Sequence, residues 1–184
     1  QEIKSSVTAT GTIEPVTLVE VGTQVSGIIS HIYVDYNSTV KKGQVIAELD
    51  RENLNSQLET AQAQLESAKS DLDYQEQNYE RQKTLHDKGH ISDNDFELAR
   101  LSYQQAKATY NQRIQSVKTA RTNLGYATIT SPIDGIILTR AVEEGQTVAS
   151  SFSTPTLFTI AKDLTDMRVI ADIDEADIGG VREG

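Results

Sequence analysis

Four residues near the C-terminus have the composition of a catalytic motif. The run Asp174-Glu175-Ala176-Asp177 has the letters of the acidic box of helicases. That box works together with an upstream phosphate-binding loop of the type Gly-x-x-x-x-Gly-Lys-Ser/Thr, and the sequence has no such loop. We therefore interpret these acids as residues that cap or solvate a β segment, and we do not predict an ATPase.

Two histidines have a spacing that could bind a metal. His86 and His90 are four residues apart, which suits zinc when both stand on one continuous helix. Gly89 is expected to end the helix between them, and no third ligand is evident, so a solvated loop is the preferred interpretation. The chain has three histidines and no cysteine, and it shows no Ser-His-Asp set, nucleophile elbow or cofactor motif. We predict a protein without catalytic residues, metal or cofactor.

The overall charge narrows the class of partner. The 184 residues include 17 basic and 27 acidic side chains, a formal net charge of −10. A nucleic-acid-binding surface needs a basic footprint, which this composition argues against. No apolar run approaches the roughly 20 residues of a membrane-spanning helix.

The middle of the chain has the pattern of two long helices that pack on each other. Residues 51–88 contain no Gly or Pro, and a second helical stretch follows after Ser92, which resembles an N-cap with Asp95 three residues later. Asp50 is expected to cap the first helix, and Gly89 and Gly125 to end the two. Each stretch has one narrow seam in steps of three and four, with Arg113 interrupting the second, so we predict an antiparallel coiled-coil hairpin. The expected seam positions are Leu54, Leu58, Ala61, Leu65, Ala68, Leu72, Gln75, Tyr79 and Gln82, then Phe96, Ala99, Tyr103, Ala106, Tyr110, Val117, Ala120 and Leu124.

The segments on either side of this hairpin repeat one plan of short strands. Residues 25–49 and 133–160 share a Gly-Ile-Ile start, a later Gly-Gln turn and a closing apolar strand. A few short strands cannot bury both faces alone, so each half needs the other. We expect the two halves to form one β domain into which the hairpin is inserted.

These motifs together resemble a known family. The two β halves, with "SPIDGII" and "EEGQTV", resemble the biotinyl/lipoyl carrier domain. A lipoyl-like domain split by a coiled-coil hairpin is similar to the periplasmic adaptors, or membrane fusion proteins (HlyD/MacA-like family), of tripartite efflux pumps. "VGTQVSGII", "TNLGYATITSPIDGII" and "GQTVASSFSTPTLFTIA" look most like the MacA-type adaptors that work with ABC transporters. The fold class is then α+β, elongated and multi-domain.

The resemblance implies a division of the chain into five segments. Residues 1–17 and 163–184 would be the first and return segments of a β-barrel domain, truncated here because the family's barrel continues beyond such a segment. Residues 18–50 and 126–162 would be the halves of the lipoyl-like domain. Residues 51–125 would be the hairpin, with its tip at about 85–92.

The resemblance also implies partners and sites. The adaptor would link an inner-membrane ABC transporter (MacB-like) to a TolC-like outer-membrane channel, as a hexamer when full length, in the periplasm and anchored to the inner membrane. Arg81, Leu85 and Ser92 match the family's Arg-x3-Leu-x6-Ser pattern for docking to the channel. Gln146 would line the hexamer's channel as a gate, with Glu143 and Glu144 making its surroundings acidic. Each also has a structural interpretation: Leu85 as the end of the coiled coil, Ser92 as an N-cap, Arg81 as a solvated charge and Gln146 as a turn residue.

Alternative functions remain open from the sequence. The adaptor could serve an RND-type efflux pump or a type I secretion system in place of an ABC transporter. A lipoyl or biotinyl carrier is less favoured, because the turn that bears the modified lysine in carriers is here Asp50-Arg51-Glu52-Asn53. Lys41 and Lys42 lie in a different turn.

Overall fold

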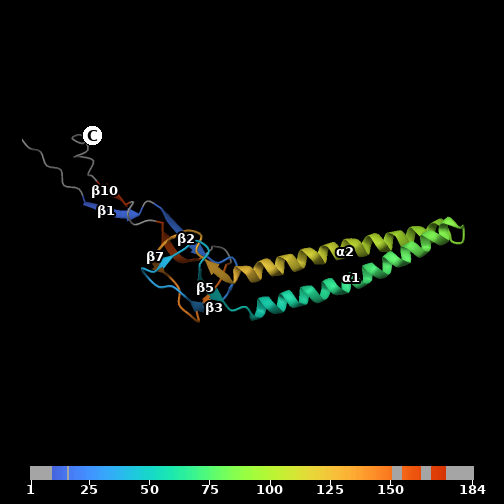
Figure 1. Cartoon of the computed structure of the whole chain (residues 1–184), viewed down its shortest axis with the longest axis horizontal. Coiled ribbons are helices and arrows are strands. Elements are labelled where there is room, and N and C mark those ends of the chain that lie inside the picture. The colour runs from blue at the N-terminus through green and yellow to red at the C-terminus, as the bar shows by residue number, and fades with distance from the viewer. Residues whose placement is uncertain (1–9, 16, 151–154, 163–166, 173–184) are drawn as a thin grey trace, which may run out of the picture.

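The molecule has three successive parts along its long axis (Figure 1). A computed structural model describes residues 10–15, 17–150, 155–162 and 167–172. A two-stranded ribbon lies at one end, a β-sandwich in the middle and a long helical hairpin at the other end. The acidic run Asp174–Asp177 lies outside the described residues.

The β-sandwich consists of two four-stranded sheets, and both halves of the chain contribute to each sheet. The strand orders are β2-β9-β7-β4 and β6-β5-β3-β8, with antiparallel pairing throughout. The strands of the first half are β2 (Leu18–Gly22), β3 (Gly27–Ile32), β4 (Thr39–Val40) and β5 (Val45–Leu49). Those of the second half are β6 (Thr128–Thr130), β7 (Gly135–Arg140), β8 (Thr147–Val148) and β9 (Thr156–Ala161).

The two halves are related by an internal repeat. The strands β2, β3, β4 and β5 of the first half correspond in order to β6, β7, β8 and β9 of the second half. When each strand in the order of the first sheet is replaced by its counterpart, the result is the order of the second sheet. The buried hydroxyls of Thr23 and Ser131 occupy equivalent places, and each donates to the backbone carbonyl two residues later. The prediction of two matching halves is therefore confirmed.

One detail of the predicted repeat is wrong. The two Gly-Gln pairs do not occupy equivalent turns, because Gly145-Gln146 precedes its strand β8 whereas Gly43-Gln44 follows β4. The true counterpart of Gly145-Gln146 is Asn37-Ser38. Asn37 and Gly145 both have positive φ, and their backbone N–H groups donate to the carbonyls of Ile137 and Ile29 respectively. Asn tolerates the left-handed region better than most residues, so the sequence match is hidden there.

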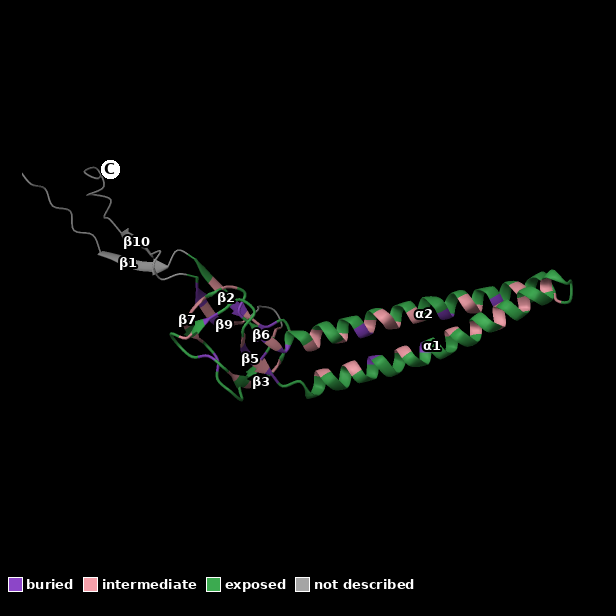
Figure 2. Cartoon of the chain, in the orientation of Figure 1, coloured by how far each residue is buried: buried purple, intermediate pink, exposed green. Residues whose placement is uncertain are grey.

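The sandwich encloses a continuous apolar core between its two sheets (Figure 2). Its largest fully buried side chain is Phe158 of β9, which packs among aliphatic residues of both halves. The close approach of the strands is tightest at Gly135, where a Cβ atom would lie 2.1 Å from the backbone oxygen of Ala161. This position admits only glycine.

The hairpin consists of α1 (Glu52–Asp87) and α2 (Asp93–Tyr126), and its predicted seam is confirmed. Every seam position named above is buried or half-buried. Arg113 stays at the seam and donates a 2.8 Å hydrogen bond to Gln64 of the other helix. Only alanines and Val117 are fully buried, so the helices approach closely but bury little apolar surface.

The helix ends largely follow the expected capping. The Asp50 carboxylate accepts from the backbone N–H of Glu52, although Arg51 occupies the N-cap position. Ser92 is the N-cap of α2 and accepts from the backbone N–H of Asp95. The helix α2 runs one residue past Gly125, and Ala127 then begins the return into the sandwich.

The remaining strands, β1 (Thr10–Pro15) and β10 (Met167–Asp172), form the separate antiparallel ribbon, with Thr10 opposite Asp172 and Pro15 opposite Met167. Both termini of the sandwich lead toward this ribbon (Figure 1).

Candidate functional site: the hairpin tip and the Gln146 turn

The tip of the hairpin is a short, fully hydrogen-bonded connection. The backbone N–H of Gly89 donates to the carbonyl of His86, and that of His90 donates to the carbonyl of Leu85. Gly89 has a φ of 72°. These two bonds around a left-handed glycine form a Schellman motif, which satisfies the last carbonyls of α1. The backbone at Leu85 is thereby held in one conformation.

A column of four rings supports the tip from below. The ring of His86 stacks on Phe96 at 4.6 Å, Phe96 on Tyr79 at 5.7 Å, and Tyr79 on Tyr103 at 5.3 Å. The column alternates between the two helices, so it ties them together where the seam is otherwise weak. Three of these rings lie at predicted seam positions, but the column itself was not predicted. The signal was available, because aromatic residues occupy alternate seam positions near the tip.

Polar contacts at both ends of the column fix its rings. The Nε2 atom of His86 lies 2.7 Å from the Asp93 carboxylate. The hydroxyl of Tyr103 donates to Glu76, and partial burial, together with that carboxylate, raises the pKa of Tyr103. His90 is exposed, and the part of the chain that the structure describes contains no group of three potential metal ligands. His86 is therefore a packed ring at the end of the column, in place of the solvated loop residue expected from the sequence.

Two of the three predicted docking residues are available to a partner. Leu85 is 39% exposed, which is high for a leucine beside a helical seam. Arg81 lies one turn before it, is exposed, and forms no ion pair with any residue that the structure describes. Ser92 follows across the turn, but its hydroxyl is engaged with Asp95 through both a donated and an accepted bond.

Apolar surface near the tip extends beyond the predicted residues. Leu98 and Leu101 of α2 are 55% and 49% exposed. A groove between the helices runs past Leu98 and is lined by Asn78, Gln82, Ile91, Asp95, Ala99 and Ser102. These two leucines were not predicted as part of the site, although a large apolar residue outside the seam is the signal that could have revealed each of them.

The predicted gate residue, Gln146, lies in an exposed turn before β8. Its side-chain oxygen accepts from the backbone N–H of Glu143 at 3.0 Å, and its carbonyl accepts from the N–H of Ile29 at 2.9 Å. Ser38 makes the same side-chain contact to the backbone N–H of Asp35 in the other half. The oxygen of the Gln146 amide thus completes the turn, while its amide nitrogen has no partner among the described residues.

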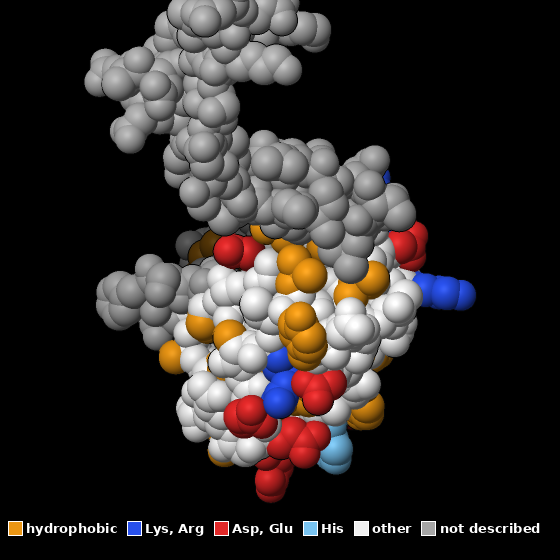
Figure 3. All heavy atoms as spheres, turned by 90° about the vertical axis from the view of Figure 1, so that its left-hand side faces the viewer, with side chains coloured by type: hydrophobic (Ala, Val, Ile, Leu, Met, Phe, Trp, Pro, Cys, Tyr) orange, Lys and Arg blue, Asp and Glu red, His pale blue; other side chains and the backbone are white. Residues whose placement is uncertain are grey.

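Charged residues beside this turn neutralise one another. Arg140 contacts Asp35 at 3.2 Å and Glu143 at 2.8 Å, and Glu144 accepts from the backbone N–H of Ile32. The backbone N–H of Tyr36, and then Arg140, lower the pKa of Asp35; hydrogen bonding to Glu143 raises that of Arg140. Acidic and basic side chains also gather in a small area of the sandwich face in Figure 3. The acidity expected from Glu143 and Glu144 is therefore partly compensated.

The sandwich and its insertion match a described protein family. The family model "RND MFP, barrel-sandwich hybrid domain" matches residues 17–160. The chain belongs to the membrane fusion proteins. These are the periplasmic adaptors of efflux pumps and are not enzymes. The match covers the sandwich and the whole inserted hairpin.

Several membrane fusion proteins are similar to this chain over its full length. The pyoverdine export membrane fusion protein PvdR of Pseudomonas putida is 34% identical, covering 100% of this chain and 50% of its own. The macrolide export protein MacA of Yersinia pestis is 31% identical, with 100% and 53% covered. The crystal structure of MacA from Actinobacillus actinomycetemcomitans is 39% identical with a TM-score of 0.62, covering 96% of this chain and 58% of its own. The chain spans about half the length of the curated relatives it matches.

The membrane fusion protein fold agrees with the architecture predicted from the sequence, including the hairpin between lipoyl-like halves. None of the helices in the described ranges is long and apolar enough to cross a membrane.

Proposed function

We propose that this membrane fusion protein links an inner-membrane ABC transporter of the MacB-like class to a TolC-like outer-membrane channel, as part of a conduit for drugs or other small molecules. The observation that supports this best is the exposed apolar residue Leu85 at the tip of a long hairpin, far from the sandwich. Relatives named as macrolide and pyoverdine export proteins support an export role. The protein would act in the periplasm as a homo-oligomer, a hexamer in the complete adaptor.

The docking surface of this proposal consists of Leu85 and Arg81. The Schellman motif and the ring column hold the last turn of α1 in place, so a partner would not have to order it on binding. Leu85 offers apolar area, and covering it would contribute roughly 1.5–3 kcal/mol per site. The guanidinium of Arg81 is unpaired within the described chain and can donate to carbonyls or carboxylates. Ser92 would act indirectly, because its hydroxyl caps α2 and positions the turn.

The test compares substitutions at the tip with a control that adds the same charge as Leu85→Asp elsewhere on α1. Leu85→Asp is expected to abolish capture of a TolC-like channel, and Arg81→Asp to reduce it strongly, while the melting temperature hardly changes. Gln62→Asp places the same charge on an exposed position of α1 far from the tip and serves as the control. Capture of the channel by Leu85→Asp at the level of Gln62→Asp would overturn the docking assignment, and the hairpin would then be a spacer.

Gln146 is proposed as a channel-lining residue of the oligomer. The free amide nitrogen at this turn could donate to neighbouring copies and form a ring of amides that constricts the conduit. Ser38 provides a matched control, because it makes the same turn contact in the other half. Gln146→Ala and Ser38→Ala should cost similar small amounts of stability, within about 0.5–1.5 kcal/mol for one exposed hydrogen bond. Only Gln146→Ala should change efflux; equal effects of both on efflux would assign Gln146 to the turn alone.

A second candidate keeps the adaptor role with an RND-type pump as its partner. The description of the matching family model, which names RND, favours it. Reconstitution with each class of transporter in turn separates the two candidates, since only the true partner should be co-purified. A type I secretion system is the remaining adaptor alternative. A lipoyl or biotinyl carrier finds no support, because β5 leads through Asp50 and Arg51 directly into α1, with no lysine in that turn.

A further inference from the structure

The helix α1 carries an uninterrupted stripe of acidic residues. An Asp or Glu stands at every seventh position along its whole length, and all six are exposed: Glu52, Glu59, Glu66, Asp73, Glu80 and Asp87. The seam that faces α2 also repeats every seven residues, so the stripe keeps a constant angle to the seam. None of the six forms an ion pair with a residue that the structure describes. The three basic residues of α1 lie outside the stripe.

The helix α2 has the opposite charge over most of its length. From Leu98 to Tyr126 it contains five basic residues and no acidic one. Arg100, Lys107 and Arg121 share one seven-residue register, Lys118 lies beside it, and all four are exposed. Only Arg100 has an ion-pair partner in the described chain, Glu97 of its own helix. The hairpin therefore has one negative and one positive helix whose outer charges are largely unpaired.

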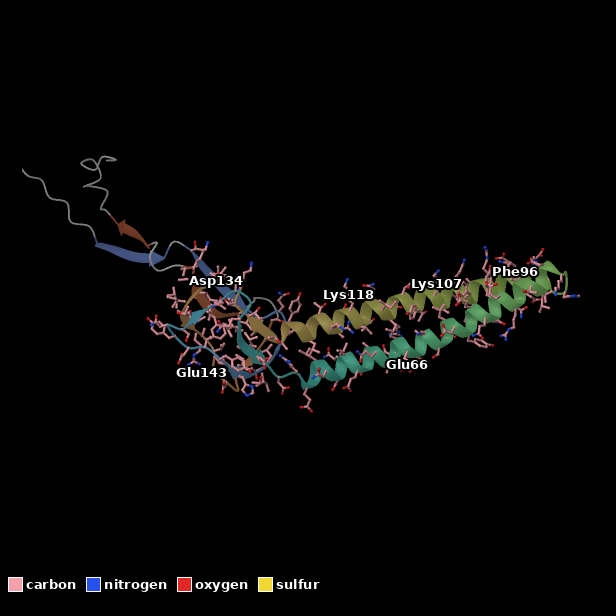
Figure 4. All side chains as sticks on the ribbon, in the orientation of Figure 1. Glu66, Phe96, Lys107, Lys118, Asp134 and Glu143 are labelled. Carbon is pink, nitrogen blue, oxygen red and sulfur yellow. The ribbon has the colours of Figure 1, made fainter. Side chains whose placement is uncertain are left out.

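Both sets of charges lie outside the seam between the helices. Glu66 of α1 and Lys107 and Lys118 of α2, labelled in Figure 4, are all exposed. The two sets also tilt toward the same face of the hairpin. Asp93, which shares the register of Arg100, contacts His86 of α1 on that face, and Glu76, next to the acidic stripe, contacts Tyr103 of α2 there.

The charges also agree in height along the hairpin. Gln64 contacts Arg113, and Tyr79 lies between Phe96 and Tyr103. Because the helices are antiparallel, counting outward from these contacts places Glu59 at the height of Lys118. The same count places Lys107 within one helical turn of the height of Asp73, and Arg100 within one turn of that of Glu80.

We infer that these two edges form one interface between copies of this chain, in which the acidic edge of α1 packs against the basic edge of α2 of the next copy. A head-to-tail contact of this kind leaves a free edge on each side, so it repeats and closes into a ring if the rotation allows. Rotation about an axis parallel to the hairpins does not move a copy along that axis. An acidic residue of α1 in one copy therefore meets the basic residue of α2 in the next copy that lies at the same position along the hairpin. This inference rests on the oligomeric adaptor proposed above and names the surface that would hold it together.

Disulfide trapping between two differently tagged chains tests the interface directly. The chain has no cysteine, so single substitutions give a clean signal. Oxidising a mixture of Asp73→Cys and Lys107→Cys chains is expected to give the mixed dimer at low salt, and much less at about 1 M salt, where screening is nearly complete. Tyr74→Cys mixed with Lys107→Cys is the control, because Tyr74 is exposed on α1 at nearly the height of Asp73 but lies outside the acidic stripe. Equal yields from the two mixtures would overturn the inference.

Charge reversal provides a second, independent readout. Lys118→Glu with Arg121→Glu in the Lys107→Cys chain should lower the yield about tenfold, which corresponds to about 1.4 kcal/mol. Adding Glu52→Lys and Glu59→Lys, which flank the height of Arg121 and Lys118, to the Asp73→Cys chain should restore it, whereas a general loss of folding would not be rescued. Failure of the rescue would refute the pairing of edges. The docking test with Leu85→Asp is unaffected by these changes, so the two proposals can fail separately.

Discussion

The sandwich and the hairpin are stabilised in different ways, although one chain forms both. The sandwich buries large side chains completely, with Phe158, Ile137 and Ile160 at 0% exposure. The hairpin buries only four alanines and Val117 over about 70 residues of helix, and it relies on caps, the ring column and cross-helix hydrogen bonds. Substitutions in the sandwich should therefore change stability, and substitutions on the hairpin should change partners.

The largest effect is expected from truncating the centre of the sandwich. Phe158→Ala leaves a cavity between the sheets and should cost about 3–5 kcal/mol of unfolding free energy, measured by urea denaturation. The hairpin should unfold together with the sandwich, because α1 follows directly from strand β5 and α2 leads directly into strand β6 of that domain. Helical circular dichroism that survives the loss of the sandwich would show that the hairpin is independent, and the comparison would need to be redrawn.

The next effect distinguishes the two halves of the repeat. Gly135→Ala would place a Cβ atom 2.1 Å from the Ala161 oxygen, whereas a Cβ at the equivalent Gly27 meets Leu49 at 3.7 Å, an ordinary contact. We expect Gly135→Ala to destabilise the protein by about 1–3 kcal/mol or more, and Gly27→Ala to have little effect. Similar melting temperatures for both variants would mean that the strands can separate at Gly135.

The sequence specified the hairpin more fully than the sandwich. Helical periodicity, Ser92 and Gly89 predicted both helices to within one or two residues, because these signals are local. The equivalence of Asn37 with Gly145 could not be read from residue identity, since it depends on φ and on hydrogen bonds between distant strands. The ring column was missed for a similar reason: the seam named its members, but stacking depends on how the two helices are aligned. Leu85 was predicted as a docking residue and is exposed, but its role stays a prediction.

A smaller and local effect is expected at the hairpin tip. Phe96→Ala removes two stacked contacts, and each such pair contributes about 0.5–1.5 kcal/mol beyond its buried area. Hydrogen exchange of the amides around Gly89 should become faster, while the urea midpoint of the sandwich stays close to that of the parent. Tyr110→Ala, at a seam position outside the column, is the control and should leave tip exchange unchanged. A shift of the global midpoint as large as that of Phe158→Ala would contradict the division between the two regions.

The smallest effect concerns the charged cluster beside the Gln146 turn. The backbone N–H of Tyr36 and the guanidinium of Arg140 lower the pKa of Asp35, so its carboxylate favours the folded state while it is ionised. This contribution is fully present above the unfolded pKa of about 3.9 and disappears as the pH falls through the lower folded value. Asp35→Asn should therefore melt slightly below the parent at neutral pH and approach it at about pH 2–3. Asp73→Asn, which removes an exposed carboxylate without an ion pair in the described chain, should show no such convergence. A constant difference for Asp35→Asn from neutral to acid pH would assign its effect to the shape of the turn, and the Arg140 contacts would then be incidental to sandwich stability.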